Sequence, residues 1–380
     1  MGITYVGPID GHNIDLMVRA FKTAFAANKP VLVHVVTEKG KGYEFAKANP
    51  SAFHGVEPFD VKTGKGLSVS KRKSYTSVFS EAICELAKED EKIAAITAAM
   101  PQGTGLDRFE TLYPERFFDV GIAEEHAVTF AAGLAAGGMK PVVAVYSTFL
   151  QRAYDQIVHD VCVGELPVVF AVDRAGIVGN DGETHQGILD LSYLSHVPGM
   201  TVMAPSDATE LRDMLRFAVS LRKPVALRYP RGSVYERKTE SRTPIAYGKA
   251  EWIYRENEIV LLAVGSMVET AIKVRELLRE GAYRVSVVNM RFVSPVDTDV
   301  LEDAAEGHRV IVTLEENVAS GGLGEKVAAY YAERGRKVQL KTIALPNHYI
   351  EHGDAEVLRD KYGLTAEKIA EEVRAFYRGQ

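Results

Sequence analysis

The pattern of hydrophobic and polar positions along the chain divides it into three blocks, and the first block ends near residue 60. Asn13 can cap a helix whose apolar residues recur at spacings of three, four and seven: Ile14, Met17, Val18, Phe21 and Phe25. The continuous apolar run at 31–36 is typical of a buried parallel strand, and a glycine-rich segment follows at 39–43. Because one helix and one strand are too little to form a core, residues 1–60 are predicted to be the tail of a larger domain.

The second block covers residues 74–240 and follows a polar, glycine-containing stretch at 61–73 that is predicted to be a linker. Strand-like and helix-like segments alternate through this block. The candidate strands are 92–97, 117–120, 141–146, 167–172, 201–204 and 225–229. Such alternation predicts a parallel sheet covered by helices on both faces.

The third block, residues 241–380, repeats this alternation on a smaller scale. Its candidate strands are 258–264, 284–288, 309–314 and 338–343, separated by helical patterns. The predicted fold class is therefore α/β, with two consecutive parallel-sheet domains preceded by a remnant of a third.

Length, charge and cysteine content argue against several classes of protein. At 380 residues the chain exceeds what one core organises, and its formal net charge of -6 argues against a nucleic-acid surface. The only two cysteines, Cys84 and Cys162, lie in apolar helix-like runs, so a disulfide framework is not expected and a reducing, cytoplasmic compartment fits. No apolar run is long enough to span a bilayer, and residues 1–5 do not form a signal peptide.

Several polar segments begin where predicted strands end, which is where parallel sheets bind ligands. These segments are 146–149, 173–176 and 230–232. Arg174 and Arg231 can clamp a phosphate group through bidentate hydrogen bonds, although either arginine alone is more often structural. Phe149 and Arg152 can likewise offer a stacking surface and an anion contact, or belong to the core and the surface.

Glu124 lies where the predicted strand 117–120 turns into a helix. Its simplest interpretation is a first-turn glutamate stabilised by the helix dipole. The helix that follows is rich in alanine and glycine, which suits close approach of another helix. A dimer interface and ordinary core packing both fit this pattern.

A glycine-rich loop is predicted at 173–187, with four glycines in fifteen residues. Asp181 and His185 in this loop can serve proton transfer or orient a substrate. The other histidines lack a metal-ligand spacing around His185, so no zinc site is expected. The segment 320–324 lacks the residues of a phosphate loop and is predicted to be a tight helix entry.

Six segments, in this order, resemble the 1-deoxy-D-xylulose-5-phosphate synthase family of the transketolase superfamily. They are 5–12, 98–101, 121–127, 146–155, 173–187 and 228–232. The resemblance implies a thiamine-diphosphate pyrimidine-binding domain at 74–240 and a transketolase C-terminal-like domain at 241–380. It also implies a homodimeric transferase that condenses pyruvate with D-glyceraldehyde 3-phosphate, for isoprenoid, thiamine and pyridoxal precursor synthesis, with thiamine diphosphate held through magnesium.

The resemblance also assigns roles to individual residues. Glu124 matches the residue that hydrogen-bonds the aminopyrimidine ring, Phe149 the one that stacks on it, and Tyr43 a further cofactor contact; Glu125 stands where many relatives have glutamine. Tyr146, Arg174 and Arg231 match phosphate-binding positions. Arg152, Asp181 and His185 match positions near the reacting carbons, and His54 matches an active-site histidine.

The family's diphosphate and magnesium ligands, a Gly-Asp-Gly motif and a downstream asparagine, have no counterpart in this sequence. The chain alone is therefore expected not to turn over substrate. Two alternatives stay open: the C-terminal chain of a split transketolase-type enzyme that pairs with a separate N-terminal chain, and a non-catalytic dimerisation or regulatory fragment. The intact set of matching side chains weighs against the second alternative.

Overall fold

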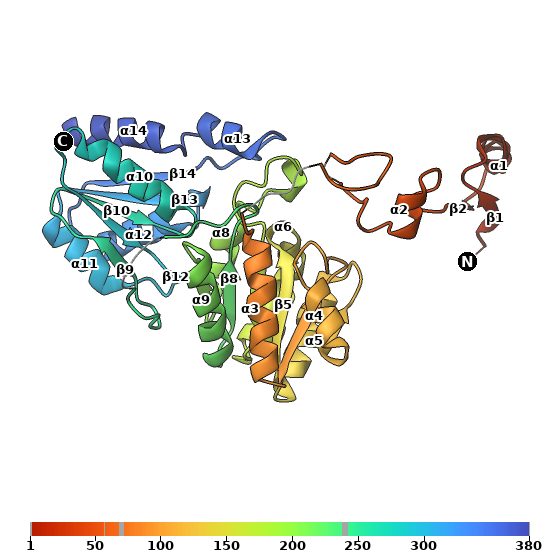
Figure 1. The fold of residues 1–380 in the computed structure, drawn as a ribbon, viewed down its shortest axis with the longest axis horizontal. Coiled ribbons are helices and arrows are strands. Elements are labelled where there is room, and N and C mark those ends of the chain that lie inside the picture. The colour runs from red at the N-terminus through yellow and green to blue at the C-terminus, as the bar shows by residue number, and fades with distance from the viewer. Residues whose placement is uncertain (1, 57, 68–71, 238–241, 380) are drawn as a thin grey trace. The chain divides into compact units, whose positions relative to one another are not determined.

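The computed structural model describes residues 2–56, 58–67, 72–237 and 242–379. The chain divides into two compact units between residues 71 and 72 (Figure 1). Residues 68–71 of the predicted linker and 238–241 at the predicted boundary of the last two blocks lie outside the described residues.

The first unit contains a parallel pair of strands joined by a helix. Its elements are β1 (Thr4–Asp10), α1 (Ile14–Ala26), β2 (Val31–Val36) and α2 (Glu44–Ala48). The predicted helix and strand are confirmed, and the Asn13 side chain accepts a hydrogen bond from the Leu16 amide at 3.1 Å. The hydrophobic pattern does not reveal β1, because Gly7 and Pro8 interrupt its apolar residues.

The apolar surface of this unit is not enclosed by its own residues. No residue of α1 is buried, and Phe25 is 84% exposed. The prediction that 31–36 is a buried strand is not met within the unit, because β2 has a single strand neighbour and Leu32 and Val36 are both exposed.

The second unit begins with a seven-stranded sheet in the order β12-β7-β8-β6-β5-β3-β4. Its strands are β3 (Ile93–Thr97), β4 (Phe117–Asp119), β5 (Lys140–Tyr146), β6 (Val169–Asp173), β7 (Thr201–Met203), β8 (Val225–Arg228) and β12 (Phe292–Ser294). Every pair is parallel except β12 with β7. All six candidate strands of the second block are confirmed.

Helices cover both faces of this sheet (Figure 1). They are α3 (Tyr75–Glu89), α4 (Asp107–Leu112), η1 (Pro114–Arg116), α5 (Glu124–Ala136), α6 (Ser147–Leu150), η2 (Gln151–Ala153), α7 (Tyr154–Gln156), η3 (Ile157–Cys162), η4 (Glu183–His185), α8 (Asp190–Ser195) and α9 (Ala208–Ser220). Neighbouring residues of one strand enter opposite cores: Ala95 packs with α3 and α9, whereas Ile96 packs with α5. Burial on both faces explains why the strands read as continuous apolar runs.

The third block forms a five-stranded sheet in the order β14-β13-β10-β11-β9. Its strands are β9 (Glu251–Tyr254), β10 (Ile259–Ala263), β11 (Val285–Asn289), β13 (Val310–Val318) and β14 (Leu340–Leu345); its helices are α10 (Met267–Arg279), α11 (Thr298–Gly307), α12 (Leu323–Glu333), α13 (Ala355–Lys361) and α14 (Ala366–Arg378). The predicted α/β class is confirmed, with antiparallel strands β9 and β12 as additions. None of the helices in the described ranges is long and apolar enough to cross a membrane.

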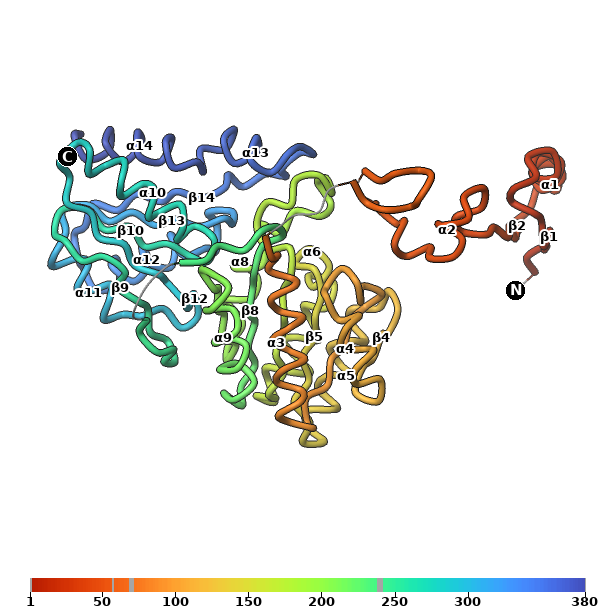
Figure 2. Tube along the Cα trace, in the orientation of Figure 1, coloured from red at the N-terminus to blue at the C-terminus, as the bar shows by residue number. Residues whose placement is uncertain are grey.

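The second and third blocks share a core. Strand β12 comes from the third block but lies beside the sheet of the second and completes it (Figure 2). One apolar cluster includes Val202 of β7 together with Val260 of β10. Thus one continuous apolar core spans the seam between the two blocks.

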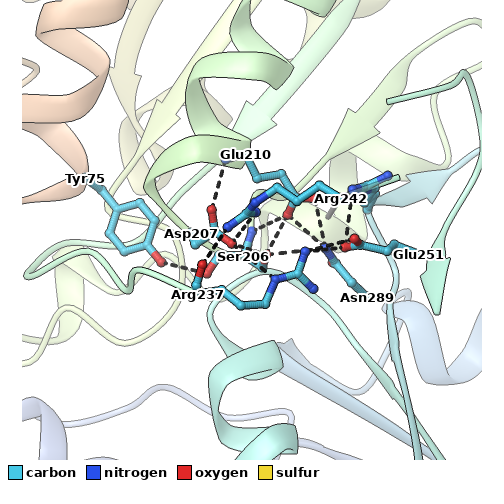
Figure 3. A network of polar contacts seen from close by, with 9 residues as sticks. Tyr75, Ser206, Asp207, Glu210, Arg237, Arg242, Glu251 and Asn289 are labelled. Atoms are coloured by element: carbon cyan, nitrogen blue, oxygen red, sulfur yellow. Dashed lines mark hydrogen bonds and ion pairs between the residues drawn. The ribbon is translucent and has the colours of Figure 1, made fainter. Parts of the chain in front are cut away.

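A buried polar network crosses the same seam (Figure 3). Glu210, at the start of α9, accepts hydrogen bonds from the Ser206 amide at 2.7 Å, from Asn289 Nδ2 at 2.9 Å and from Arg291 Nε at 2.6 Å. Arg291 also lies 3.2 Å from Glu251. Burial opposes ionisation of Glu210, but Arg291 and the hydrogen-bond donors outweigh it and hold the pKa of this carboxyl below its ordinary value.

Two further arginines extend this network. Arg237 pairs with Glu251 at 2.8 Å, and Arg242 pairs with Asp207 at 2.7 Å. Asp207 also accepts from the Glu210 amide at 3.0 Å and so caps α9. The charges are therefore matched within the protein, with three carboxylates facing three arginines.

The glycine-rich turn before α12 is a tight helix entry, as predicted, and a buried carboxylate accepts hydrogen bonds from the first backbone amides of the helix. Glu315 of β13 accepts hydrogen bonds from the Leu323 amide at 2.7 Å and the Gly324 amide at 2.8 Å. A Cβ on Gly322 would lie 2.2 Å from this carboxylate, so only glycine allows the close approach. Burial raises the pKa of Glu315 to about 7.

This raised pKa predicts a pH-dependent contribution to stability. The folded state binds the proton more tightly than the unfolded state, so the contribution is present at low pH and is lost as pH rises from about 4.5 to about 7. The Glu315→Gln variant stays neutral and should gain about 3 kcal/mol relative to the native chain between pH 4.5 and pH 7.5. Urea unfolding of both proteins at the two pH values measures the difference, and a gap that does not change with pH would contradict the assignment.

Candidate active site

The segments predicted to bind ligands meet at the carboxyl edge of the seven-stranded sheet. Tyr146, the last residue of β5, lies beside Asp173, the last residue of β6, in the parallel register. Strand β8 neighbours β6 and leads into Pro230 and Arg231. The edge therefore brings together three segments that are far apart in the sequence.

Glu124 begins α5, directly after β4 and a glycine turn. Its carboxylate is 2% exposed and accepts hydrogen bonds from Arg152 Nη1 at 2.9 and 3.1 Å. The positive end of the helix dipole and the guanidinium both favour a negative charge at this position. Arg152 is 47% exposed, so its side chain can move aside without opening the core.

Phe149 of α6 forms the centre of an aromatic cluster that is linked to Glu124 through Arg152. Its ring stacks on Tyr146 with centroids 5.7 Å apart, and the His185 ring meets it edge-on at 5.3 Å. The Arg152 guanidinium lies 5.1 Å from the centre of the same ring. One aromatic side chain thus joins the pair Arg152–Glu124 to His185.

Arg174 is held rigidly at the end of β6. Its guanidinium lies 4.0 Å over the Tyr146 ring, 3.0 Å from the Asp173 carboxylate and 2.5 Å from the Gly103 carbonyl oxygen. A Cβ on Gly103 would lie 1.8 Å from the Tyr146 hydroxyl, so this turn requires glycine. The Arg174 Nε is buried and has no hydrogen-bond partner among the described residues.

Charges from both candidate arginines act on Tyr146. Burial raises the pKa of the Tyr146 hydroxyl, while Arg174 and Arg231 act to lower it. Arg231 pairs with Asp181 at 2.7 Å, which ties the loop 174–187 to the end of β8. His185 lies at the end of this loop, with its Nδ1 2.9 Å from the Thr184 hydroxyl.

The structure thus gathers Glu124, Phe149, Arg152 and His185, and places Tyr146, Arg174, Arg231 and Asp181 in a second, connected group. Tyr43 and His54 belong to the first unit. Tyr43 packs against Phe45, Phe53 and Phe59 and donates its hydroxyl to the Val61 carbonyl at 2.9 Å, and His54 Nδ1 lies 3.3 Å from Lys39 Nζ.

Sequence reasoning assigned no role to Asp173 and Thr76, although both support this edge. Asp173 is fully buried and accepts hydrogen bonds from the Thr76 hydroxyl at 2.8 Å and from the Arg174 amide at 2.7 Å. An aspartate that ends an otherwise apolar strand was the available signal. No signal in the sequence indicated the role of Thr76, because its hydrogen-bond partner Asp173 lies 97 residues away.

The arrangement fits one side of an aromatic, nitrogen-containing cofactor. A buried carboxylate beside a phenyl ring can hold a ring nitrogen and cover a ring face. By contrast, no group of three or more His, Cys, Asp or Glu within the described ranges is arranged to hold a metal ion. The residues present therefore fit the pyrimidine part of thiamine diphosphate.

Comparison with known proteins identifies the family. Residues 71–236 match the transketolase pyrimidine-binding domain, residues 248–369 the transketolase C-terminal domain, and residues 1–37 a family model of 1-deoxy-D-xylulose-5-phosphate synthase. The 1-deoxy-D-xylulose-5-phosphate synthase of Lachnoclostridium phytofermentans is 56% identical over 98% of this chain, and that of Aquifex aeolicus is 48% identical over all of it.

The match covers only part of these relatives, since the chain spans about 60% of the length of each. Among solved structures, a split-gene transketolase described as an inactive β4 tetramer has a TM-score of 0.73 and 28% sequence identity. That similarity covers 80% of this chain and 98% of the other. The chain therefore belongs to the transketolase superfamily, and within it the chain is similar in sequence to the 1-deoxy-D-xylulose-5-phosphate synthases.

Proposed function

We propose that this chain provides the pyrimidine-binding and substrate-phosphate side of a 1-deoxy-D-xylulose-5-phosphate synthase active site. The reaction is the decarboxylating condensation of pyruvate with D-glyceraldehyde 3-phosphate, in the cytoplasm, for synthesis of isoprenoid, thiamine and pyridoxal precursors. The observation that carries the proposal is the buried Glu124 carboxylate at a helix N-terminus, joined through Phe149 to His185 and the strand-end arginines.

Glu124 would hold the aminopyrimidine ring through a hydrogen bond to a ring nitrogen, with Phe149 against the ring face and Tyr43 as a further contact. Thiamine diphosphate, when bound, supplies the nucleophilic carbon and the electron sink for decarboxylation. Arg152 now pairs with Glu124, so it would share or release this carboxylate and turn toward the substrate. Arg152 is exposed and free to turn, but Glu124 is buried, so the bound ring would have to supply the hydrogen bond that Glu124 loses.

The acceptor substrate would lie along the strand ends. Arg174 and Arg231 carry fixed positive charge beside Tyr146, which suits a phosphate group. His185 and Asp181, both on the loop 174–187, would hold or move the proton at the aldehyde oxygen, and His54 would act from the first unit.

Turnover would require a diphosphate-binding domain with magnesium ligands that the 380 residues do not contain, within a homodimer or with a separate chain. The similarity to the split-gene transketolase favours a second candidate, in which this chain is the C-terminal partner of a divided transketolase-type enzyme. A non-catalytic role in dimerisation or regulation is the third candidate.

A product assay separates these candidates. Pyruvate and D-glyceraldehyde 3-phosphate are supplied with thiamine diphosphate and magnesium, with and without an N-terminal domain from a homologous synthase. We expect 1-deoxy-D-xylulose 5-phosphate only in the complemented reaction. Ketol transfer from a sugar phosphate donor, without consumption of pyruvate, would establish the transketolase alternative instead. No product with either donor in the complemented reaction would leave the non-catalytic role.

A further inference from the structure

The loop that carries Asp181 and His185 is held in place by contacts with the third block of the chain. Its neck is closed by a pair of hydrogen bonds, from the Gly176 amide to Gly187 O at 2.6 Å and from the Gly187 amide to Gly176 O at 2.8 Å. Above this neck the loop bonds to the second block through Asp181 and Thr184, the latter accepting from the Thr148 hydroxyl at 2.8 Å. The neck, formed by Gly176 and Gly187, packs against β13 and against the segment before α13.

Glu316 of β13 is the main support. Its side chain is 2% exposed, and one carboxylate oxygen accepts from the Ile177 amide at 3.2 Å and from Arg359 Nε at 2.9 Å. The other oxygen accepts from the Ser266 hydroxyl at 3.2 Å. A Cβ on Gly176 would lie 2.7 Å from the Glu316 carboxyl carbon, so the loop backbone lies directly against this group.

A second support comes from Gln186 inside the loop. Its side-chain oxygen accepts from the Val178 amide at 2.7 Å and the Gly179 amide at 3.2 Å, while its nitrogen donates to the Glu351 carbonyl at 3.2 Å. The backbone near Gly353 then closes on Gly179, where an added Cβ would lie 2.7 Å from the Gly353 carbonyl oxygen.

We infer that Glu316 is a positioning residue for the acceptor-substrate site, acting through the loop 174–187 and assisted by Gln186. The inference rests on the function proposed above for Asp181 and His185. Glu316 is not among the residues placed near substrate or cofactor, and its charge is neutralised by Arg359. Its contribution is to fix the neck of the loop, so that Asp181 reaches Arg231 and His185 reaches the Phe149 ring.

Hydrogen exchange of the full chain, followed by mass spectrometry, tests the support directly. In Glu316→Ala the amides of residues 176–187 should exchange at least about tenfold faster, while those of β10, residues 259–263, keep the native rate. Gln186→Leu leaves the Glu316–Arg359 pair intact and should show the same local effect. Glu356→Ala removes the other, exposed carboxylate partner of Arg359 and serves as the matched control with native rates.

Unchanged exchange in the loop, or an equal acceleration in β10, would overturn the inference. If Glu316→Ala fails to fold, Glu316→Gln, which keeps the shape of the side chain and loses its charge, replaces it in the same exchange experiment, with native loop rates again counting against the inference. In the complemented enzyme, the variants should raise KM for glyceraldehyde 3-phosphate at least about fivefold and leave KM for pyruvate unchanged. A loss of folded protein with both KM values unchanged would show a merely structural role. If even the native complemented chain is inactive, the proposed function fails while the exchange result still stands.

Discussion

The Glu124→Ala variant, complemented with an N-terminal domain, is expected to lose product formation by about a thousandfold or more. The carboxylate is buried at a helix N-terminus, with Arg152 as its hydrogen-bonding partner among the described side chains. Alanine leaves nothing at this position that can hold a ring nitrogen or exchange a proton with it. Steady-state assay of 1-deoxy-D-xylulose 5-phosphate gives the ratio of the two rates.

Glu125→Gln is the matched control, because Glu125 is the adjacent, exposed residue of the same helical turn. It removes one negative charge from α5 without touching the buried carboxylate, and its rate should equal that of the native chain. Sustained normal turnover in Glu124→Ala would refute the assigned role, whatever the control shows.

The Glu210→Ala variant is expected to lower the free energy of unfolding of the second unit by about 3–5 kcal/mol. The change leaves the Arg291 guanidinium, which is 2% exposed, without its closest carboxylate. It also leaves the Ser206 amide without an acceptor and Asn289 Nδ2 with the Ser206 hydroxyl, at 3.3 Å, as its remaining acceptor (Figure 3). Burial makes each of these losses expensive, because water cannot replace the missing partner. Urea unfolding followed by circular dichroism at pH 7 measures the effect.

The control for this variant is Asp303→Ala, which breaks the exposed pair between Asp303 and Arg255. Exposed pairs contribute about 0–1 kcal/mol, so this variant should unfold close to the native midpoint. Equal midpoints for Glu210→Ala and the native chain would show that the network at the seam does not hold the two blocks together.

Much of the fold follows from the hydrophobic pattern alone. Strands such as β5 and β10 are buried on both faces and therefore appear as apolar runs between helices. The pattern does not indicate β9 and β12, which join their sheets as antiparallel edge strands. Nor can it reveal the seam network, in which Glu210 meets Arg291 across 81 positions of sequence.

The candidate site, like the fold, could be predicted from the sequence only in part. Ligands bind beyond the carboxyl ends of parallel strands, and this rule alone predicts that Tyr146, Arg174 and Arg231 lie at one edge of the sheet. The pairing of Arg152 with Glu124 and the support of the loop by Glu316 depend on side-chain positions that only the packed chain fixes. Roles for Tyr43 and His54 come from the family resemblance and remain predictions.

We propose that these 380 residues carry the pyrimidine side of the cofactor site and need a further domain for its diphosphate side. Calorimetric titration with thiamine diphosphate and magnesium tests it most directly, first on the chain alone and then after addition of an N-terminal domain from a homologous synthase. We expect no saturable heat from the chain alone and tight, magnesium-dependent binding from the complemented protein. Tight binding by the chain alone, or none after complementation, would contradict the claim.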